Sequence, residues 1–354
     1  MDGQLVSIVV PAFNAERTLA ETARSALSGR YGNIELIIVD DGSSDGTAAV
    51  ARRLSETDAR VRLVQRANGG LPAALNSGFA VASGEYVARL DSDDIWHPDK
   101  LATQLRLAQE RPEAAFIYTF FRYIDGKNHV LRDGPAQAFP PHALARGLYE
   151  TILGTGSSVL MKRCAVEAVG GCEESPRTWE DLLLQLKISA AHEIAFVSEY
   201  LVGIRLRRES LSQQTDEMLA GWRQVRARVP ELFPQVPACI HNWGHAIRLL
   251  EIAESYAWRG RYLASAAQLF EALAHDPAFV LRFVRYRIAR SARRRFRSPI
   301  GHQPGRDFFD YSSKEPAGLD PFQIAAEGPG LLKLRDKRMK EVAELDEALA
   351  RLRD

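Results

Sequence analysis

The sequence predicts an α/β fold with a mostly parallel central sheet, followed by a region built of helices. In the first 212 residues, β-branched runs such as LVSIVV, IELIIVD and VRLVQ alternate with stretches whose apolar residues recur at helical spacing. This alternation is typical of βαβ units, whose parallel strands are buried on both faces. Beyond residue 212 no strand-like run follows, so we expect a domain boundary there.

The elements of the first domain can be predicted in order. Strand-like runs span residues 5–10, 34–40, 61–65, 86–90, 115–124, 157–163 and 193–206. Helical spacing covers residues 16–29, 45–56, 72–83, 97–112, 164–171 and 179–192. Asp45, at the start of the second helix, is expected to cap it. A DGKN turn and a Pro-rich stretch predict a variable binding loop at about 125–155.

Composition and charge exclude several classes of protein. The 354-residue chain has 46 Lys and Arg against 45 Asp and Glu, so its charge gives no sign of a nucleic-acid partner. Cys164, Cys172 and Cys239 lack metal-ligand spacing and indicate reduced thiols. No basic segment precedes the first apolar run, and no apolar run is long enough to cross a bilayer. We therefore expect a cytoplasmic protein without a membrane span.

The region after the first domain is predicted to be helical over residues 213–300, including a helical hairpin at 249–277. Within it, residues 282–298 contain eight arginines and no acid. This segment is either a solvated helix or tail, or a basic amphipathic helix that lies on an anionic membrane surface. An irregular linker and a charged C-terminal helix are expected over residues 301–354.

Two of the predicted strands end in clustered carboxylates. Asp40 and Asp41 end one strand, and Asp91, Asp93 and Asp94 follow another. If the strands are parallel, these side chains gather at one edge of the sheet, where open α/β sheets bind ligands. Crowded carboxylates repel one another unless a cation lies among them, which suggests Mg²⁺ or Mn²⁺ bridging to a diphosphate. The alternative is that each cluster only forms a turn and caps a helix.

Five segments of the first domain form a pattern that is more specific than any one of them. They are SIVVPAFNAERTLAETARSAL, IELIIVDDGSSDGTAAVA, GEYVARLDSDDIWHPDKL, TGSSVLMKR and WEDLLLQLK. In this order and spacing they resemble the family 2 glycosyltransferases. The resemblance implies a GT-A domain, a Rossmann-like nucleotide-diphospho-sugar transferase fold, over residues 1–212. It also implies an inverting enzyme that uses Mn²⁺ or Mg²⁺.

The same resemblance suggests the residues that bind the nucleotide. Pro11, Ala12 and Phe13 correspond to a wall of the nucleotide pocket, and Asp41 to a carboxylate that accepts a hydrogen bond from the base, usually uracil. Residues 68–76 lack the basic residue that many relatives carry there, so contacts to the diphosphate must come from elsewhere.

The Asp-x-Asp element of the family is matched by Asp91 and Asp93. The resemblance implies that Asp93 is a metal ligand and that Asp91 contacts the ribose or the metal, while Asp94 is a weaker candidate. Where the family often has a histidine after its last strand, this chain has Arg207, which cannot bind a cation but can grip a diphosphate. Arg89 can either contact the diphosphate or pair with Asp91.

On the acceptor side, Glu180 and Asp181 resemble the family's acidic pair, in which the aspartate takes the proton from the acceptor hydroxyl. An inverting displacement needs one base opposite the leaving group, which agrees with this role for Asp181. Trp179 could stack on an acceptor sugar, although core packing is the default for tryptophan. The alternative for Glu180 and Asp181 is a favourable charge at a helix N-terminus.

The sequence therefore predicts an inverting glycosyltransferase that moves a sugar from a nucleotide-diphospho-sugar, UDP-linked by preference, to a saccharide or lipid-linked saccharide. Such a reaction belongs to the synthesis of cell-surface polysaccharides or glycans. A peripheral contact with an anionic membrane would bring the enzyme to lipid-linked acceptors. Two alternatives are a sugar nucleotidyltransferase and a non-catalytic protein that binds sugar nucleotides. The first turn, PAFNAERT, lacks the Gly-rich basic loop expected of a nucleotidyltransferase.

Overall fold

The computed structural model describes residues 3–136, 138–150, 154–207, 214–294, 307–314 and 329–352, without the side chains of residues 286–294 and 329–332. The chain divides into two compact units. The first comprises Met1–Pro141, Leu153–Arg208 and Pro304–Asp320, and the second comprises His142–Ile152, Glu209–Gln303 and Pro321–Asp354. Each unit is therefore built from separate stretches of sequence, and the domain limits predicted above stay a prediction.

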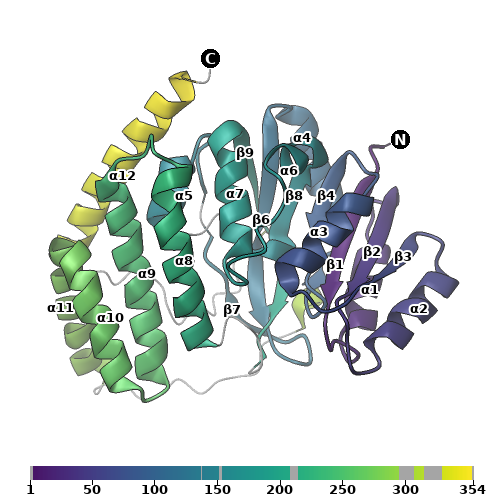
Figure 1. Ribbon diagram of the computed structural model, residues 1–354, viewed down its shortest axis with the longest axis horizontal. Coiled ribbons are helices and arrows are strands. Elements are labelled where there is room, and N and C mark those ends of the chain that lie inside the picture. Colours follow the sequence, from purple (N-terminus) through teal and green to yellow (C-terminus); the bar gives the residue numbers. More distant parts are fainter. Residues whose placement is uncertain are drawn as a thin grey trace. The chain divides into compact units, whose positions relative to one another are not determined.

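The first unit contains a nine-stranded sheet in the order β3-β2-β1-β4-β8-β6-β9-β5, with β7 paired to β6 (Figure 1). The strands are β1 (Val6–Ala12), β2 (Ile34–Asp40), β3 (Val61–Gln65), β4 (Tyr86–Arg89), β5 (Ile95–Trp96), β6 (Ala114–Ile124), β7 (Val130–Asp133), β8 (Val159–Lys162) and β9 (Glu193–Arg205). Strands β1 to β4 are mutually parallel, and β6 is parallel to β9. Strand β8 runs antiparallel to both β4 and β6, so these two strands share one direction. The predicted α/β fold with a mostly parallel sheet is confirmed.

Helices cover both faces of this sheet. They are α1 (Leu19–Leu27), α2 (Thr47–Thr57), α3 (Leu71–Val81), α4 (Lys100–Glu110), α6 (Arg163–Ala168) and α7 (Glu180–Ala191). On one face, Ile8 of β1 shares a buried core with Leu19 of α1 and Leu101 of α4. On the other, α3 comes so close that a Cβ added at Gly78 would lie 2.3 Å from Val9 Cγ1. Burial on both faces explains why the strands are continuous apolar runs in the sequence.

Three elements lie where the sequence predicts none. Strand β5 has only 2 residues, too few to show a period. Strand β7 and helix α5 (Leu144–Glu150) fall within the section predicted as a loop, so that prediction is wrong for these residues. The burial of α5 comes from α9 and α12, which are distant in sequence, and no local pattern could reveal it. The N-cap residue of α2 is Gly46 rather than the predicted Asp45, although Asp45 Oδ1 accepts a hydrogen bond from Thr47 N, in the first residue of the helix, at 3.0 Å.

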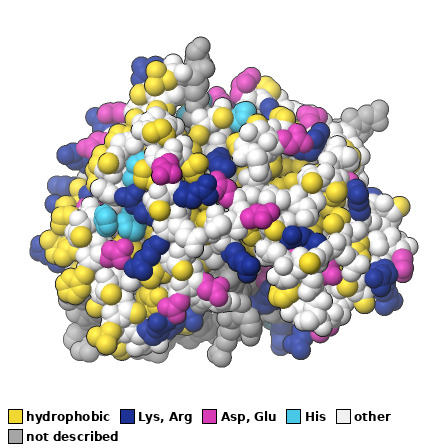
Figure 2. All heavy atoms as spheres, viewed as in Figure 1, with side chains coloured by type: hydrophobic (Ala, Val, Ile, Leu, Met, Phe, Trp, Pro, Cys, Tyr) yellow, Lys and Arg dark blue, Asp and Glu magenta, His cyan; other side chains and the backbone are white. Residues whose placement is uncertain are grey.

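The described part of the second unit is helical. Besides α5 it contains α8 (Thr215–Leu232), α9 (Ala238–Trp258), α10 (Tyr262–His275), α11 (Pro277–Arg294) and α12 (Pro329–Arg351). Helices α9 and α10 form the predicted hairpin, in which Ser265 Oγ donates to Ala253 O at 2.8 Å. None of the helices in the described residues is both long and apolar enough to cross a membrane. Figure 2 shows acidic and basic side chains interspersed over one face of the protein, in keeping with its near-zero net charge.

Two predictions for the C-terminal region reach beyond the described residues. The arginine-rich segment 282–298 begins in α11, but residues 295–298 lie outside the described part. Of the expected linker, residues 301–306 and 315–328 also lie outside it, and the predicted charged helix corresponds to α12.

Candidate active site

The clustered carboxylates lie at one edge of the central sheet. Asp40 is the last residue of β2, and Asp91, Asp93 and Asp94 follow β4. Strands β2 and β4 flank β1 and are parallel to it, so their carboxyl ends share an edge. Ligands of open α/β sheets bind at this kind of edge.

The Asp41 carboxylate is buried and is held mainly by the backbone of a glycine loop. Its oxygens accept hydrogen bonds from Gly69 N at 3.0 Å and Gly70 N at 2.8 Å, and Arg66 Nη1 donates to it at 2.7 Å. Gly70 has φ +89°, which favours glycine at this position. Residues 68–76 contain no basic side chain. Arg66, two residues before this stretch, nevertheless brings a positive charge beside Asp41.

The predicted nucleotide-pocket wall begins at the end of β1. Pro11 and Ala12 are the last two residues of that strand and are buried. Phe13 follows and is 52% exposed. Asn14, at φ +50°, fixes the turn by accepting a hydrogen bond from Ser44 N at 2.9 Å. Of the predicted wall, only Phe13 offers a substantial side-chain surface to a ligand.

Arg89 joins the Asp-x-Asp element to the acidic pair of α7. Its Nε and Nη2 donate to the Asp91 carboxylate at 2.7 and 3.1 Å, while Nη1 donates to Glu180 Oε1 at 2.8 Å. Burial alone would lower the pKa of Arg89, but the charges of Asp91 and Glu180 outweigh it and raise the pKa well above its usual value. The guanidinium therefore stays charged. Of the two alternatives that the sequence allowed for Arg89, the structure has the salt bridge with Asp91.

Two arginines hold Asp93. Arg205, the last residue of β9, contacts its backbone, and Arg207, two residues further along the chain, contacts its side chain. Arg205 Nε donates to Asp93 O at 2.8 Å, and Arg207 Nη2 forms an ion pair with the Asp93 carboxylate. Arg205 is buried and also donates to Glu21 Oε2 at 2.9 Å and to Asn128 Oδ1 at 2.8 Å. Arg205 therefore fixes the position of the Asp-x-Asp loop, and Arg207 pairs with the Asp93 carboxylate of that loop.

Asp94 is buried, and its carboxylate holds the loop that follows β4 in place. It accepts hydrogen bonds from Ser157 Oγ at 2.6 Å and from Arg205 N at 3.0 Å. Ser157 Oγ also accepts the hydrogen bond of Asp91 N at 3.0 Å. Burial, together with the charges of Asp93 and Asp91, raises the pKa of Asp94 well above its usual range. Asp94 and Ser157 thus set the shape of the loop.

The acceptor-side pair opens helix α7, and its two members differ in environment. Glu180 is buried against Arg89, and burial raises its pKa to about 7, although the Arg89 charge opposes the shift. Asp181 is partly exposed, and its Oδ1 accepts a hydrogen bond from Leu182 N at 2.8 Å. Trp179 precedes them at φ +68°, a left-handed conformation that is strained for a bulky residue. Glu180 is therefore the buried member of the pair, and the more accessible carboxylate is that of Asp181.

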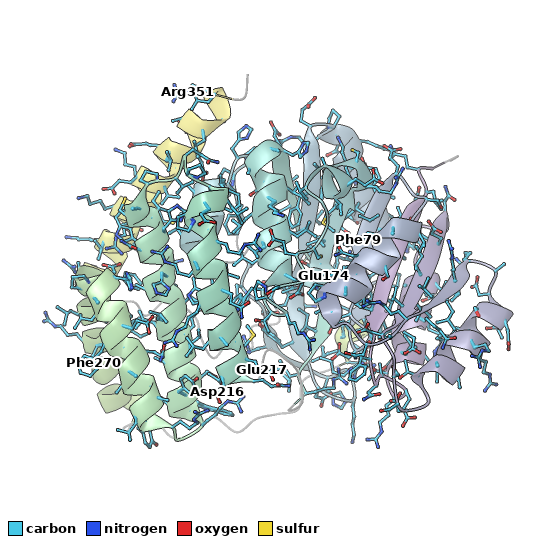
Figure 3. The ribbon with its side chains drawn as sticks, in the orientation of Figure 1. Phe79, Glu174, Asp216, Glu217, Phe270 and Arg351 are labelled. Atoms are coloured by element: carbon cyan, nitrogen blue, oxygen red, sulfur yellow. The ribbon has the colours of Figure 1, made fainter. Side chains whose placement is uncertain are left out.

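A cavity lies beside Asp181. It lies between α3 and α7 and is lined by Arg89 and Asp181 together with Gln185 and mostly apolar side chains. Phe79 of α3, labelled in Figure 3, is one of these, and Cys172 is another. Burial raises the pKa of the Cys172 thiol to about 12, so this cysteine is a neutral wall residue.

The comparison with known proteins agrees with this arrangement. The model of the family described as Glycosyl transferase family 2 matches residues 7–170. The glycosyltransferase TuaG of Bacillus subtilis, named for teichuronic acid biosynthesis, is 34% identical over 216 residues, which cover 59% of this chain and 81% of TuaG. The chain belongs to glycosyl transferase family 2. An uncharacterized glycosyltransferase of Rickettsia conorii is 33% identical over 59% of this chain, and the match covers 35% of that protein.

Solved structures of glycosyltransferases share the GT-A fold of this family member. Residues 1–349 of TarS from S. aureus match with a TM-score of 0.57 at 17% identity, covering 78% of this chain and 82% of that one. The mannosyltransferase PcManGT from Pyrobaculum calidifontis, in complex with GDP-Man and Mn²⁺, matches with a TM-score of 0.55 at 21% identity, covering 83% and 81%. The first curated relatives are matched over about a third to two thirds of their own length, 35% and 64%.

The residues of the Asp-x-Asp element fit a divalent cation. Asp91 and Asp93 supply hard oxygen donors at a partly exposed edge. Burial raises the pKa of Asp93, and the neighbouring Asp91 charge adds to the shift while the Arg207 charge opposes it. Within the described residues no three His, Cys, Asp or Glu side chains form a ready-made metal cluster. One or two carboxylates completed by phosphate oxygens and water are, however, the usual protein contribution to a Mg²⁺ site.

Several residues of this site carry no mark in the sequence. Arg66, Ser157 and Arg205 hold Asp41, Asp94 and Asp93, respectively. The Gly69-Gly70 pair before a helix was a readable signal for a loop whose amides could hold a carboxylate. The arginine and serine partners could only be found in three dimensions.

Proposed function

We propose that this family member is an inverting glycosyltransferase, which moves a sugar from a nucleoside-diphosphate donor to a saccharide or lipid-linked saccharide. The observation that carries the proposal is the Arg89 bridge between Asp91 and Glu180. This bridge joins Asp91 of the Asp-x-Asp element to Glu180, the neighbour of Asp181, which supports a shared role for the two acidic groups. The similarity to TuaG supports a reaction in polysaccharide synthesis.

On the donor side, Asp41 and Phe13 would bind the nucleotide. Phe13 offers an exposed ring for stacking, and the buried Asp41 carboxylate is fixed by amides before any ligand arrives. Pro11 and Ala12 would position the ring rather than contact the base extensively. We expect a UDP-sugar, and Arg207 would contact the diphosphate through its guanidinium.

Asp93, assisted by Asp91, would hold Mn²⁺ or Mg²⁺ against the diphosphate. When bound, the cation would stabilise the negative charge that develops on the departing nucleoside diphosphate. Arg207 already pairs with Asp93 and would shift part of its charge to the same phosphates.

On the acceptor side, Asp181 would act as the general base. It would take the proton of the acceptor hydroxyl while that oxygen bonds to the anomeric carbon, and the electron pair of the broken bond would leave with the diphosphate. One displacement inverts the anomeric centre without a covalent enzyme intermediate. Glu180, held by Arg89, would position the start of α7, and Trp179 would offer its ring to the acceptor sugar.

An acceptor carried on a lipid would lie at a membrane surface. The proposal therefore includes a peripheral contact with the cytoplasmic face of an anionic membrane.

The test is nucleoside diphosphate release from a panel of nucleotide sugars with Mn²⁺ or Mg²⁺, with and without acceptor extracts. We expect Asp181→Asn to lower kcat by about 10²–10⁴-fold, and Asp93→Asn to raise the metal concentration required for half-maximal rate. Glu56→Gln, an exposed position on α2, is the matched control. Pyrophosphate formation would indicate a nucleotidyltransferase, and binding without turnover a non-catalytic protein. Full activity in both variants would exclude the assigned roles.

A further inference from the structure

The second unit exposes an apolar ridge that its own core does not use. On α10, Leu263 is 91% exposed and Phe270 is 73% exposed, with exposed alanines between and beyond them at positions 267 and 274. This spacing of four and three residues places all four on one helical face. Further exposed large apolar side chains lie at the end of α9, the start of α10 and on α11. The apolar ridge is defined as Trp258, Tyr262, Leu263, Phe270 and Leu281.

The ridge gathers five exposed large apolar side chains on neighbouring helices. Single exposed apolar residues are ordinary, whereas a continuous group of aromatic and aliphatic side chains marks a contact surface. Figure 2 shows hydrophobic side chains gathered over α10, and Figure 3 labels Phe270 on this helix. Trp and Tyr in such a group suit a boundary between apolar and wet surroundings.

Positive charge borders the ridge. Helix α11, which carries Leu281, contains six arginines and no acid. Of its arginines, Arg282 and Arg285 are exposed. Arg259 and Arg261 lie in the turn between Trp258 and Tyr262.

The acids nearby already have partners. Asp276 is buried against Arg338, and Nη2 of that arginine donates to it at 2.7 Å. Glu271 of α10 accepts a hydrogen bond from Arg223 at 3.0 Å. Asp216 of α8 pairs with Arg261. These three carboxylates are therefore paired with arginines, whereas Arg282 and Arg285 lie exposed on a helix that carries no acid of its own.

We propose that the apolar ridge, flanked by Arg282 and Arg285, docks the protein on an anionic membrane surface. Apolar side chains that enter the headgroup boundary, with arginines at the level of the phosphates, form the combination that holds interfacial helices on anionic lipid. A second copy of the chain is the weaker occupant, because its α11 would bring equal positive charge to the contact. The inference rests on the proposed function only in that a lipid-linked acceptor would be reached at this surface.

The test is flotation of the full chain with two kinds of vesicle, one of phosphatidylcholine alone and one of equal parts phosphatidylcholine and phosphatidylglycerol. We expect the chain to float with the anionic vesicles and not with the neutral ones, and high salt to weaken the binding. The double variant Leu263→Glu/Phe270→Glu should lose at least about tenfold in partitioning.

The matched control is Leu352→Glu, because Leu352 at the end of α12 is 82% exposed but is not part of the ridge. It should bind as the unchanged chain does. Both variants should keep the same far-UV circular dichroism and the same melting temperature, since neither position is buried.

Nucleoside diphosphate release with a soluble acceptor, measured in parallel, separates this inference from the proposed function. Vesicle binding without release would contradict only the proposed function. Equal binding by the double variant would overturn the docking surface, and absence of binding would overturn both this surface and the proposed membrane contact while leaving the proposed glycosyl transfer untouched. A dimer in solution that the double variant dissociates, without vesicle binding, would assign the ridge to contact between copies and overturn it as well.

Discussion

The two groups of carboxylates at the edge of the sheet are held in different ways. Asp41 is held mainly by backbone amides of Gly69 and Gly70, which belong to a nearby loop. Asp91 and Asp93 are held by arginine side chains, Arg89 and Arg207. A carboxylate fixed by amides tolerates the loss of one neighbouring side chain, whereas one fixed by a buried arginine does not. Single substitutions should therefore separate the two regions.

The largest effect is expected from Arg89→Met. Removing this buried guanidinium leaves Asp91 and Glu180 without their shared partner, which should cost about 4 kcal/mol of unfolding free energy. Urea unfolding of the variant measures it. Arg89→Met/Glu180→Gln should recover part of the loss, because one uncompensated carboxylate is gone; a double variant no more stable than the single one would contradict the bridge.

Arg205→Met should have the next largest effect. Arg205 donates to the Asp93 carbonyl, to Glu21 and to Asn128, so its loss leaves several acceptors unsatisfied and should cost about 3 kcal/mol. Arg30→Met is the matched control: Arg30 is 74% exposed and pairs with Asp99, and its loss should cost less than about 1 kcal/mol. Equal losses in the two variants would show that Arg205 is not a structural centre.

Glu180 should give stability a distinct pH dependence. Its pKa is about 7 in the folded protein, above the usual carboxyl value, so the folded state keeps a proton that the unfolded state has lost. Stability should therefore fall as pH rises from about 4.5 to about 7, by about 3 kcal/mol at most. Glu180→Gln should remove this part of the decline, measured by urea unfolding at several pH values. An identical decline in the variant would mean that another group is responsible.

The smallest effect is expected on the amide-held side. Arg66→Met removes one of three donors to Asp41 but leaves both glycine amides, so it should cost about 1 kcal/mol or less. Gly70→Ala should cost more than this, because φ +89° is strained for alanine. If Arg66→Met were as costly as Arg89→Met, the contrast between the two regions would fail.

Much of the fold could be predicted because its strands are buried on both faces. Runs such as IELIIVD have no other reading than a buried strand once helices flank them. The two-residue strand β5 and helix α5 escaped prediction, since the first is too short for a period and the second is buried by α9 and α12. Local pattern predicts elements; it does not predict which distant surface will cover them.

For the candidate site, the sequence predicts the acidic residues but not the side chains that hold them. The motifs and the ends of the predicted strands identify Asp91, Asp93 and Asp181, but they do not predict how exposed these side chains are. The sequence could not tell that Glu180 is the buried member of its pair, nor whether Arg89 meets a phosphate or Asp91. Both depend on the distance between β4 and α7, which the structure supplies.

Trp179 has a consequence for how the helix of the acidic pair is built. A tryptophan at φ +68° holds its backbone at a cost of about 1 kcal/mol, a cost that glycine would not have. Trp179→Gly and Trp179→Ala should thus separate the effect of backbone strain from the effect of the indole ring. Both variants lack the indole, but only the alanine variant keeps the strain.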